Sequence, residues 1–189
     1  MPTILLNTEA QVYDHTQGRA INTPKSYGKS IKAADLPLGI SKFFPLATSD
    51  APRGQGLPKE LLHRVLQGIL TAVQRIREAV QSAEMRMVGG SILVVYEADW
   101  DRLRKCLEEW PMDADELEDY EEPDEDDADD GSGVVGEGDG KTGPPYLVKL
   151  IDFAHTSVRE GEGPDKGVLL GLDTVINLLE GRIDQFTGL

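Results

Sequence analysis

Several residue types are scarce in this sequence, and their scarcity narrows the class of protein. Cys106 is the single cysteine among 189 residues, so no intramolecular disulfide can form, and we expect a reducing compartment. No apolar run approaches the roughly 20 residues that cross a bilayer. The first residues also lack the basic region and long apolar core of a secretory signal. We therefore expect a soluble protein without a membrane span, in the nucleus, the cytoplasm or both.

Basic residues are also in deficit, with 19 lysines and arginines against 34 acids and a net charge of -15. The acidity is local, because residues 113–130 hold 13 acids and no basic residue. Removing those 13 charges from -15 leaves -2 for the rest of the chain. Direct binding of a nucleic-acid backbone needs an excess of positive charge on one face, so we expect no nucleic-acid partner.

The acidic run belongs to a low-complexity segment, Met112 to Gly143, whose second part is rich in glycine. Such a composition buries little apolar surface and predicts disorder. We expect one domain in two pieces, residues 1–111 and 146–189, separated by an insertion over 112–145. The insertion is either a solvated loop or a contact for basic protein partners such as transcription or chromatin proteins.

Apolar periodicity predicts the ordered elements. Steps of three and four residues mark a long amphipathic helix from Pro58 to about Glu84. A polar stretch with Gly18 in its turn predicts a hairpin beginning at Gln11–Asp14. The further predicted elements are an apolar run Thr3–Leu6, a loop over 26–30 and a short helix over 31–36, a strand Gly89–Glu97, a helix Trp100–Trp110, and a helix Val168–Glu180 with Gly181 as its C-terminal cap.

A short apolar run from Leu147 to Ile151, interrupted by Lys149, predicts a buried strand that ends at Asp152. We expect this strand to pair with residues 91–96, with the insertion looped out between them. An aspartate at the end of a buried strand suits a metal carboxylate in phosphate-transfer enzymes. From spacing alone, a turn in which Asp152 caps its own backbone is an equal alternative.

Four segments, in order along the chain, resemble motifs of the inositol polyphosphate kinase family. Residues 148–156, Val-Lys-Leu-Ile-Asp-Phe-Ala-His-Thr, followed by 164–172, Pro-Asp-Lys-Gly-Val-Leu-Leu-Gly-Leu, resemble its C-terminal signature. Gly90–Glu97 is similar to its Ser-Ser-Leu-Leu-x-x-Tyr-Glu strand, with Gly90 in place of the first serine. Lys25–Ile31 and Gln11–Tyr13 resemble its Tyr-(Phe/Tyr)-Gly-Arg-Ser-Leu and Met-(Arg/Gln)-Val-Tyr segments. Within the family, the acidic insertion is most similar to that of fungal inositol polyphosphate multikinases.

This resemblance implies a kinase that uses ATP and Mg²⁺ to phosphorylate an inositol phosphate. Asp152 is then the metal ligand, and His155 faces the inositol phosphate, where the alternative is a histidine that caps the turn. Ser91 bonds the nucleotide or the water shell of the metal, unless it bonds only a backbone group. Lys29 meets a substrate phosphate, unless it is simply solvated. We accordingly assign catalytic roles to Asp152 and His155.

The resemblance also implies an α+β fold, the C-terminal lobe of a two-lobed kinase, with an antiparallel sheet packed against helices. The family's Pro-x-x-x-Asp-x-Lys-x-Gly motif precedes the Met-Arg-Val-Tyr strand and does not occur in this sequence. We therefore expect the N-terminal lobe to be missing, as in a truncated gene model, a fragment or a degenerate copy. The alternative function is a catalytically inactive binding or regulatory fragment that acts through the acidic insertion.

Overall fold

The computed structural model describes residues 10–110 and 143–187. The predicted run Thr3–Leu6 and nearly all of the insertion lie outside these residues. In chain order the elements are β1 (Gln11–Asp14), β2 (Arg19–Asn22), α1 (Lys25–Ser30), a 3-10 turn (Ala33–Asp35), α2 (Leu36–Phe43), α3 (Lys59–Ser82), β3 (Met85–Met87), β4 (Ser91–Tyr96), α4 (Trp100–Glu109), β5 (Tyr146–Ile151), a 3-10 turn (Phe153–His155), β6 (Thr156–Val158) and α5 (Lys166–Thr187). None of the helices in these ranges has the length and apolarity required to span a bilayer.

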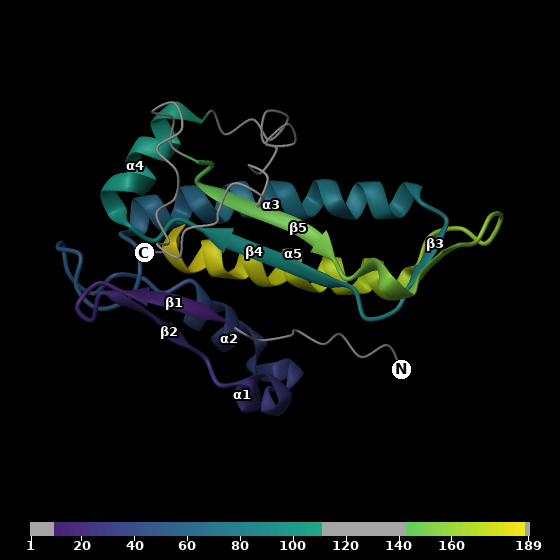
Figure 1. Ribbon diagram of the computed structural model, residues 1–189, viewed down its shortest axis with the longest axis horizontal. Coiled ribbons are helices and arrows are strands. Elements are labelled where there is room, and N and C mark those ends of the chain that lie inside the picture. Colours follow the sequence, from purple (N-terminus) through teal and green to yellow (C-terminus); the bar gives the residue numbers. More distant parts are fainter. Residues whose placement is uncertain (1–9, 111–142, 188–189) are drawn as a thin grey trace, which may run out of the picture.

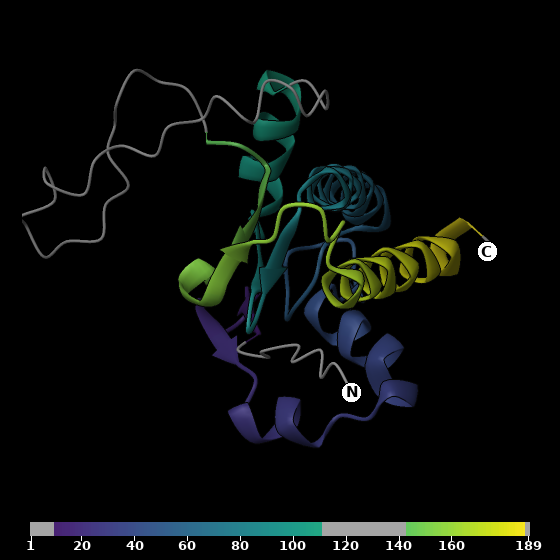
Figure 2. The ribbon, with the colours of Figure 1, turned by 90° about the vertical axis from the view of Figure 1, so that its right-hand side faces the viewer.

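The long helix α3 is the centre of the core. Its predicted apolar face is confirmed, since Leu62, Val65, Leu66, Ile69 and Val73 are completely buried. Each such side chain contributes roughly 1.5–3 kcal/mol when it leaves water. Helix α5 packs along α3, and the two helices cover one face of the β4–β5 ribbon (Figure 2). The third side of the core is closed by α4, whose buried side chains include Trp100 and Leu103.

Strands β4 and β5 form an antiparallel pair whose register runs from Ser91 opposite Ile151 to Tyr96 opposite Tyr146. This pairing confirms that the strands on either side of the insertion meet in space. Side chains alternate between the two faces. Ile92 and Val94 turn toward the helices and contribute to the core. The other face leaves Val95 half exposed, at 50%.

The first two strands, β1 and β2, form the predicted hairpin (Figure 1). Gly18 lies in its turn with φ of 62°, a left-handed conformation that glycine adopts without strain. The buried carboxylate of Asp14 accepts hydrogen bonds from the backbone N–H groups of Thr16 and Gln17 at 2.9 and 3.0 Å. The hairpin is therefore fixed by its own turn as well as by its ladder.

Several parts of the chain differ from the sequence prediction. The helix predicted over 31–36 is instead a 3-10 turn at Ala33–Asp35, followed by α2 from Leu36. Residues 26–30, predicted as a loop, belong to α1, which begins after Pro24. Helix α5 does not end at Gly181 but continues to Thr187, because Ile183 and Phe186, two and five residues further on, are buried. The antiparallel pair of β3 and β6 was not predicted, since three residues per strand are too few to show a period.

Two helical glycines provide a matched test of this packing. A Cβ on Gly68 would collide with the ring of Tyr146, whereas a Cβ on Gly181 would meet nothing within 4 Å. We expect Gly68→Ala to destabilise the fold by about 1–3 kcal/mol, the usual cost of overpacking. Gly181→Ala should stabilise it by about 0.5–1 kcal/mol, because alanine loses less backbone entropy in a helix. Urea unfolding of both variants measures the difference, and equal stabilities would contradict the close contact between α3 and β5.

Candidate functional site

Asp152 occupies a special backbone position at the end of β5. Its φ of 68° and ψ of 51° place it in the left-handed region, and it is the one non-glycine residue of the described chain with positive φ. Aspartate tolerates this conformation better than most residues. The conformation ends β5 and directs the chain into the 3-10 turn Phe153–His155.

The carboxylate of Asp152 is exposed and makes no hydrogen bond to cap the following turn. Among the side chains that the structure describes, which do not include those of Lys25 and Lys29, none forms a hydrogen bond or ion pair with it. The alternative of an aspartate that caps its own backbone is therefore wrong. The left-handed backbone breaks the strand without help from the side chain, and the side chain remains available to a ligand.

Ser91 and His155 lie at the same end of the β4–β5 ribbon as Asp152. Ser91 pairs with Ile151, the residue before Asp152. The backbone N–H of Val88, in the turn that leads to β4, donates to the carbonyl of His155 at 3.2 Å. The structure thus brings together three of the four predicted site residues, from two segments about 60 positions apart in the sequence.

The imidazole of His155 is exposed, and the turn is capped instead by the backbone N–H of Thr156, which donates to Phe153. The alternative of a histidine side chain that caps the turn is therefore not observed. An exposed imidazole can donate a hydrogen bond to a phosphate oxygen.

A network of charged side chains, missed by sequence reasoning, fixes the loop that follows β6. The carboxylate of Glu84 accepts from the N–H groups of Gly161 and Gly163 at 2.8 and 3.1 Å. The guanidinium of Arg86 donates to the carbonyls of Gly163 and Glu162 at 2.7 and 2.9 Å. These contacts hold β3, β6 and the loop together next to the turn that carries His155.

Asp165, which lies just before α5, completes this frame. One carboxylate oxygen accepts from the N–H groups of Gly167 and Val168 in the first turn of α5, and the other accepts from Met87 in β3. Burial alone raises the pKa of Asp165, but the three N–H donors and the nearby Arg86 outweigh it, so the pKa is lower than that of an ordinary aspartate.

The structure defines less about two other predicted features, the contact of Lys29 with substrate and the metal site. Lys29 lies in α1, and its side chain is outside what the structure describes, so it is not placed relative to Asp152. Within the described ranges, no three His, Cys, Asp or Glu side chains converge on a possible metal position. Asp152 is thus an exposed carboxylate outside any such three-residue cluster. That donor set fits Mg²⁺ bound by one protein carboxylate together with phosphate oxygens and water.

An apolar groove lies elsewhere, between the β1–β2 hairpin and β4, and has a volume of about 570 Å³. We call it the β1–β4 groove. Its lining includes Val12, Ile69 and Val94 but not Ser91, Asp152 or His155. The groove and the candidate metal position are therefore separate features.

Comparison with known proteins gives consistent results. A family model described as inositol polyphosphate kinase matches residues 8–180. The inositol polyphosphate multikinase of Saccharomyces cerevisiae is 27% identical over 186 residues, which cover 94% of this chain and 50% of that protein. Inositol hexakisphosphate kinase 3 of Mus musculus is 25% identical over 177 residues, covering 89% of this chain and 35% of that protein. The chain thus spans between a third and a half of the length of these relatives.

Two solved structures share the fold. The inositol phosphate multikinase Ipk2 of S. cerevisiae, in complex with ADP and Mn²⁺, superposes with a TM-score of 0.56 at 22% identity over 91% of this chain and 55% of that chain. A second inositol phosphate multikinase structure gives a TM-score of 0.54 at 19% identity, covering 91% and 59%. The architecture is accordingly the α+β fold of inositol kinases.

The backbone of Asp152 leads to a prediction about stability. Asp152→Gly should leave the free energy of unfolding unchanged or raise it slightly, because glycine adopts positive φ without strain. Asp152→Ala should lower it by about 1 kcal/mol relative to the glycine variant, since a Cβ in this region is unfavourable. Thermal unfolding compares the two. An alanine variant as stable as the glycine variant would show that residue 152 does not hold a left-handed conformation in solution.

The low pKa of Asp165 leads to a prediction about pH. A carboxyl whose folded pKa is depressed stabilises the fold above its unfolded pKa of about 3.9, and this contribution disappears as pH falls through the lower folded value. Asp165→Asn keeps a side-chain oxygen for the cap but loses the negative charge, so it should cost about 0.3–1 kcal/mol at pH 7, the usual worth of an anion at a helix N-terminus. The deficit should shrink below pH 4, as measured by urea unfolding at pH 7, 5 and 3. A deficit that is constant across this range would mean that the charge of Asp165 contributes nothing.

Proposed function

The chain belongs to the inositol polyphosphate kinase family, and we propose that it provides the metal-binding, C-terminal lobe of an ATP-dependent inositol polyphosphate kinase. The observation that carries this proposal is the match of the family model over residues 8–180, together with an unengaged carboxylate at Asp152, at the end of β5. The reaction transfers the γ-phosphoryl group of ATP to a hydroxyl of an inositol phosphate. It yields ADP and a new phosphate ester, and the hydroxyl proton is released.

Each site residue has a role in this reaction. Asp152 would hold Mg²⁺, which would supply positive charge to the phosphate oxygens. The left-handed backbone at Asp152 sets where the side chain leaves the chain at the end of β5. Ser91, one strand away, donates its hydroxyl to the nucleotide or to metal-bound water. His155 donates to a phosphate of the inositol substrate, and its positive form attracts that phosphate.

These residues alone are not sufficient for phosphoryl transfer. Phosphoryl transfer depends mostly on positioning and on cations around the phosphates. The family's Pro-x-x-x-Asp-x-Lys-x-Gly motif, with its lysine and aspartate, is absent from the 189 residues. We propose that this lobe binds metal and nucleotide weakly and becomes active when a lobe with that motif is added.

We therefore expect that the purified chain, given radiolabelled ATP and inositol trisphosphate, produces no labelled product above background. Turnover by the wild-type chain that is abolished in Asp152→Asn would overturn this limit. A chimaera tests whether the lobe becomes active when the missing motif is supplied. In it, the part of the S. cerevisiae multikinase that lies outside the matched region is joined to this chain. The chimaera should phosphorylate the substrate, and Asp152→Asn should reduce turnover by at least 100-fold, as expected when a metal ligand is lost.

Metal binding tests the role of Asp152 even if the chimaera is inactive. Electron paramagnetic resonance of Mn²⁺ with ADP should detect binding by the wild-type chain and a roughly 10-fold or greater loss of affinity in Asp152→Asn. Asp35→Asn removes an equally exposed carboxylate in the 3-10 turn before α2 and should have no effect. Equal binding by wild type and Asp152→Asn would contradict the assignment and would favour a lobe without catalytic function.

A further inference from the structure

The β1–β4 groove has strands along both of its walls. Residues of β1 line one wall and Ile92 to Tyr96 of β4 line the other. In Figure 1, β1 lies between β2 and β4, so each strand turns its outer edge toward the groove. Among the described residues, β1 pairs with β2 and β4 pairs with β5, but β1 and β4 do not pair with each other.

The register shows which backbone groups of β4 face the groove. Hydrogen-bonded and non-bonded positions alternate along an antiparallel pair. The N–H of Glu97 donates to the carbonyl of Pro145, which extends the β4–β5 ladder by one residue. Odd-numbered residues of β4 are therefore bonded to β5. The N–H and C=O groups of Ile92, Val94 and Tyr96 point the other way, to the edge that borders the groove.

The same reasoning applies to β1. The N–H of Thr23 donates to the carbonyl of Ala10, so even-numbered residues of β1 are bonded to β2. The N–H and C=O groups of Gln11 and the N–H of Tyr13 are left for the opposite edge, whose far end is bridged from Asp14 to Gln55. That edge can accept a partner, because its far end already does: the N–H of His15 donates to the carbonyl of Gly54 at 2.8 Å.

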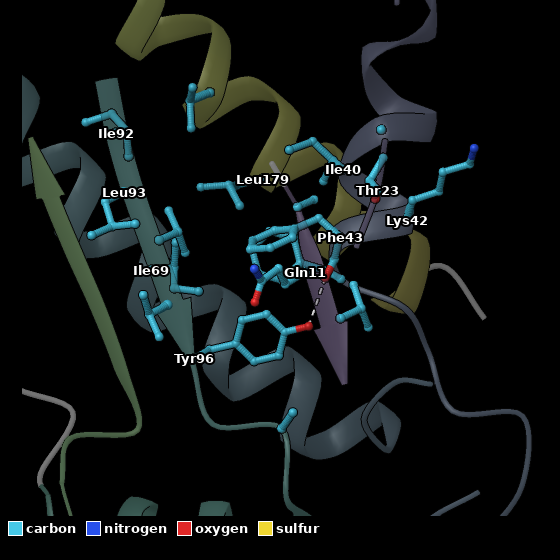
Figure 3. A pocket seen from close by; sticks show the side chains of 18 of the residues that line it. Gln11, Thr23, Ile40, Lys42, Phe43, Ile69, Ile92, Leu93, Tyr96 and Leu179 are labelled. Carbon is cyan, nitrogen blue, oxygen red and sulfur yellow. Dashed lines mark hydrogen bonds between the residues drawn. The ribbon is translucent and has the colours of Figure 1, made fainter. Parts of the chain in front are cut away.

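The floor of the groove is apolar. Ile69 of α3, Leu179 of α5 and Phe43 of α2 supply its side chains, as Figure 3 shows. Several polar side chains interrupt this lining, and two of them bear on what the groove binds. The hydroxyl of Tyr27 is buried and has no partner among the described residues. Lys42 is exposed at the rim, with its ammonium 4.2 Å from the centre of the Tyr27 ring.

We propose that the β1–β4 groove binds a single β-strand of a partner polypeptide, inserted between β1 and β4. The strand has apolar side chains at alternate positions, which face the floor, and an acidic residue near Lys42. Its backbone pairs with Ile92, Val94 and Tyr96 on one side, and with Gln11 and the N–H of Tyr13 on the other. Five residues suffice, because β4 offers five residues to the groove, about 17 Å of extended chain.

The backbone groups favour a strand over a lipid or another apolar ligand. An apolar ligand would fill the floor but would leave the N–H and C=O groups of both walls without water and without partners. An extended polypeptide satisfies both walls at once, which is the usual mode of strand addition to an open sheet edge. This inference does not depend on the kinase assignment.

A labelled peptide, acetyl-Thr-Val-Thr-Val-Thr-Val-Glu-amide, tests the proposal with the full 189-residue chain. Its net charge has the same sign as that of the protein, so simple electrostatic attraction does not produce binding. The matched control is the same peptide N-methylated at the three valines, which keeps side chains and charge but removes backbone donors. We expect saturable fluorescence anisotropy with the first peptide and at least a 10-fold weaker response with the second.

Amide hydrogen exchange locates the bound peptide. Binding should slow exchange at Ile92, Val94, Tyr96, Gln11 and Tyr13. The corresponding protein variants are Tyr13→Pro, which removes an N–H from the groove wall but none from the β1–β2 ladder, and Tyr13→Ala, which keeps that N–H. Circular dichroism checks that both are folded. Proline should weaken peptide binding roughly fivefold more than alanine, the worth of about one hydrogen bond.

Several results would overturn the proposal. One is equal binding of the methylated and unmethylated peptides, and another is displacement of the peptide by decanoate without any change in exchange at the strand edges. A third is a peptide that does not bind to a chain in which the five amides of β1 and β4 exchange slowly even without peptide. Slow exchange in the free chain would mean that these strand edges are already paired, either within the chain or with a second copy. The exchange data decide these cases even if Tyr13→Pro does not fold.

Discussion

The packing of α3 against β5 and α5 is the contact on which the rest of the structure depends. Tyr146, the first residue of β5, lies directly on Gly68 of α3, so the strand approaches the helix closely only because the helix has no side chain there. That contact sets the start of β5, and the strand's six residues then carry the chain to Asp152. The position of the carboxylate is thus determined by a glycine in the core, at the other end of the strand.

Much of this architecture can be predicted from the sequence because its signals are long. Helix α3 shows its apolar period over 24 residues, and the apolar runs of β4 and β5 suggest their pairing across the insertion. Shorter features give no such signal. The three-residue strands β3 and β6 depend on pairing with each other, and α5 passes Gly181 because Ile183 and Phe186 find burial beyond it. The formation of β3 and β6 and the end of α5 are determined by tertiary contacts and not by local sequence propensity.

In the candidate site, too, some features can be predicted from the sequence and others cannot. Its residue types follow from the resemblance of four motifs to the inositol polyphosphate kinases, and the structure places Ser91, Asp152 and His155 at one end of a ribbon. The surrounding frame was not predictable. Glu84 and Arg86 act on a loop almost 80 residues later, and no spacing rule connects charges at that distance. The left-handed backbone of Asp152 is likewise a property of the folded chain, because a turn with a capping side chain would have the same sequence.

The left-handed conformation of Asp152 also has an evolutionary consequence. Glycine and asparagine fit this backbone about as well as aspartate does, yet neither supplies a negative charge. The position can therefore lose its chemistry in a single nucleotide change while the fold keeps its stability, and selection for folding alone would not remove such a change. Among copies of the gene released from selection for catalysis, codon 152 is where drift to asparagine or glycine would accumulate early and leave a well-folded descendant.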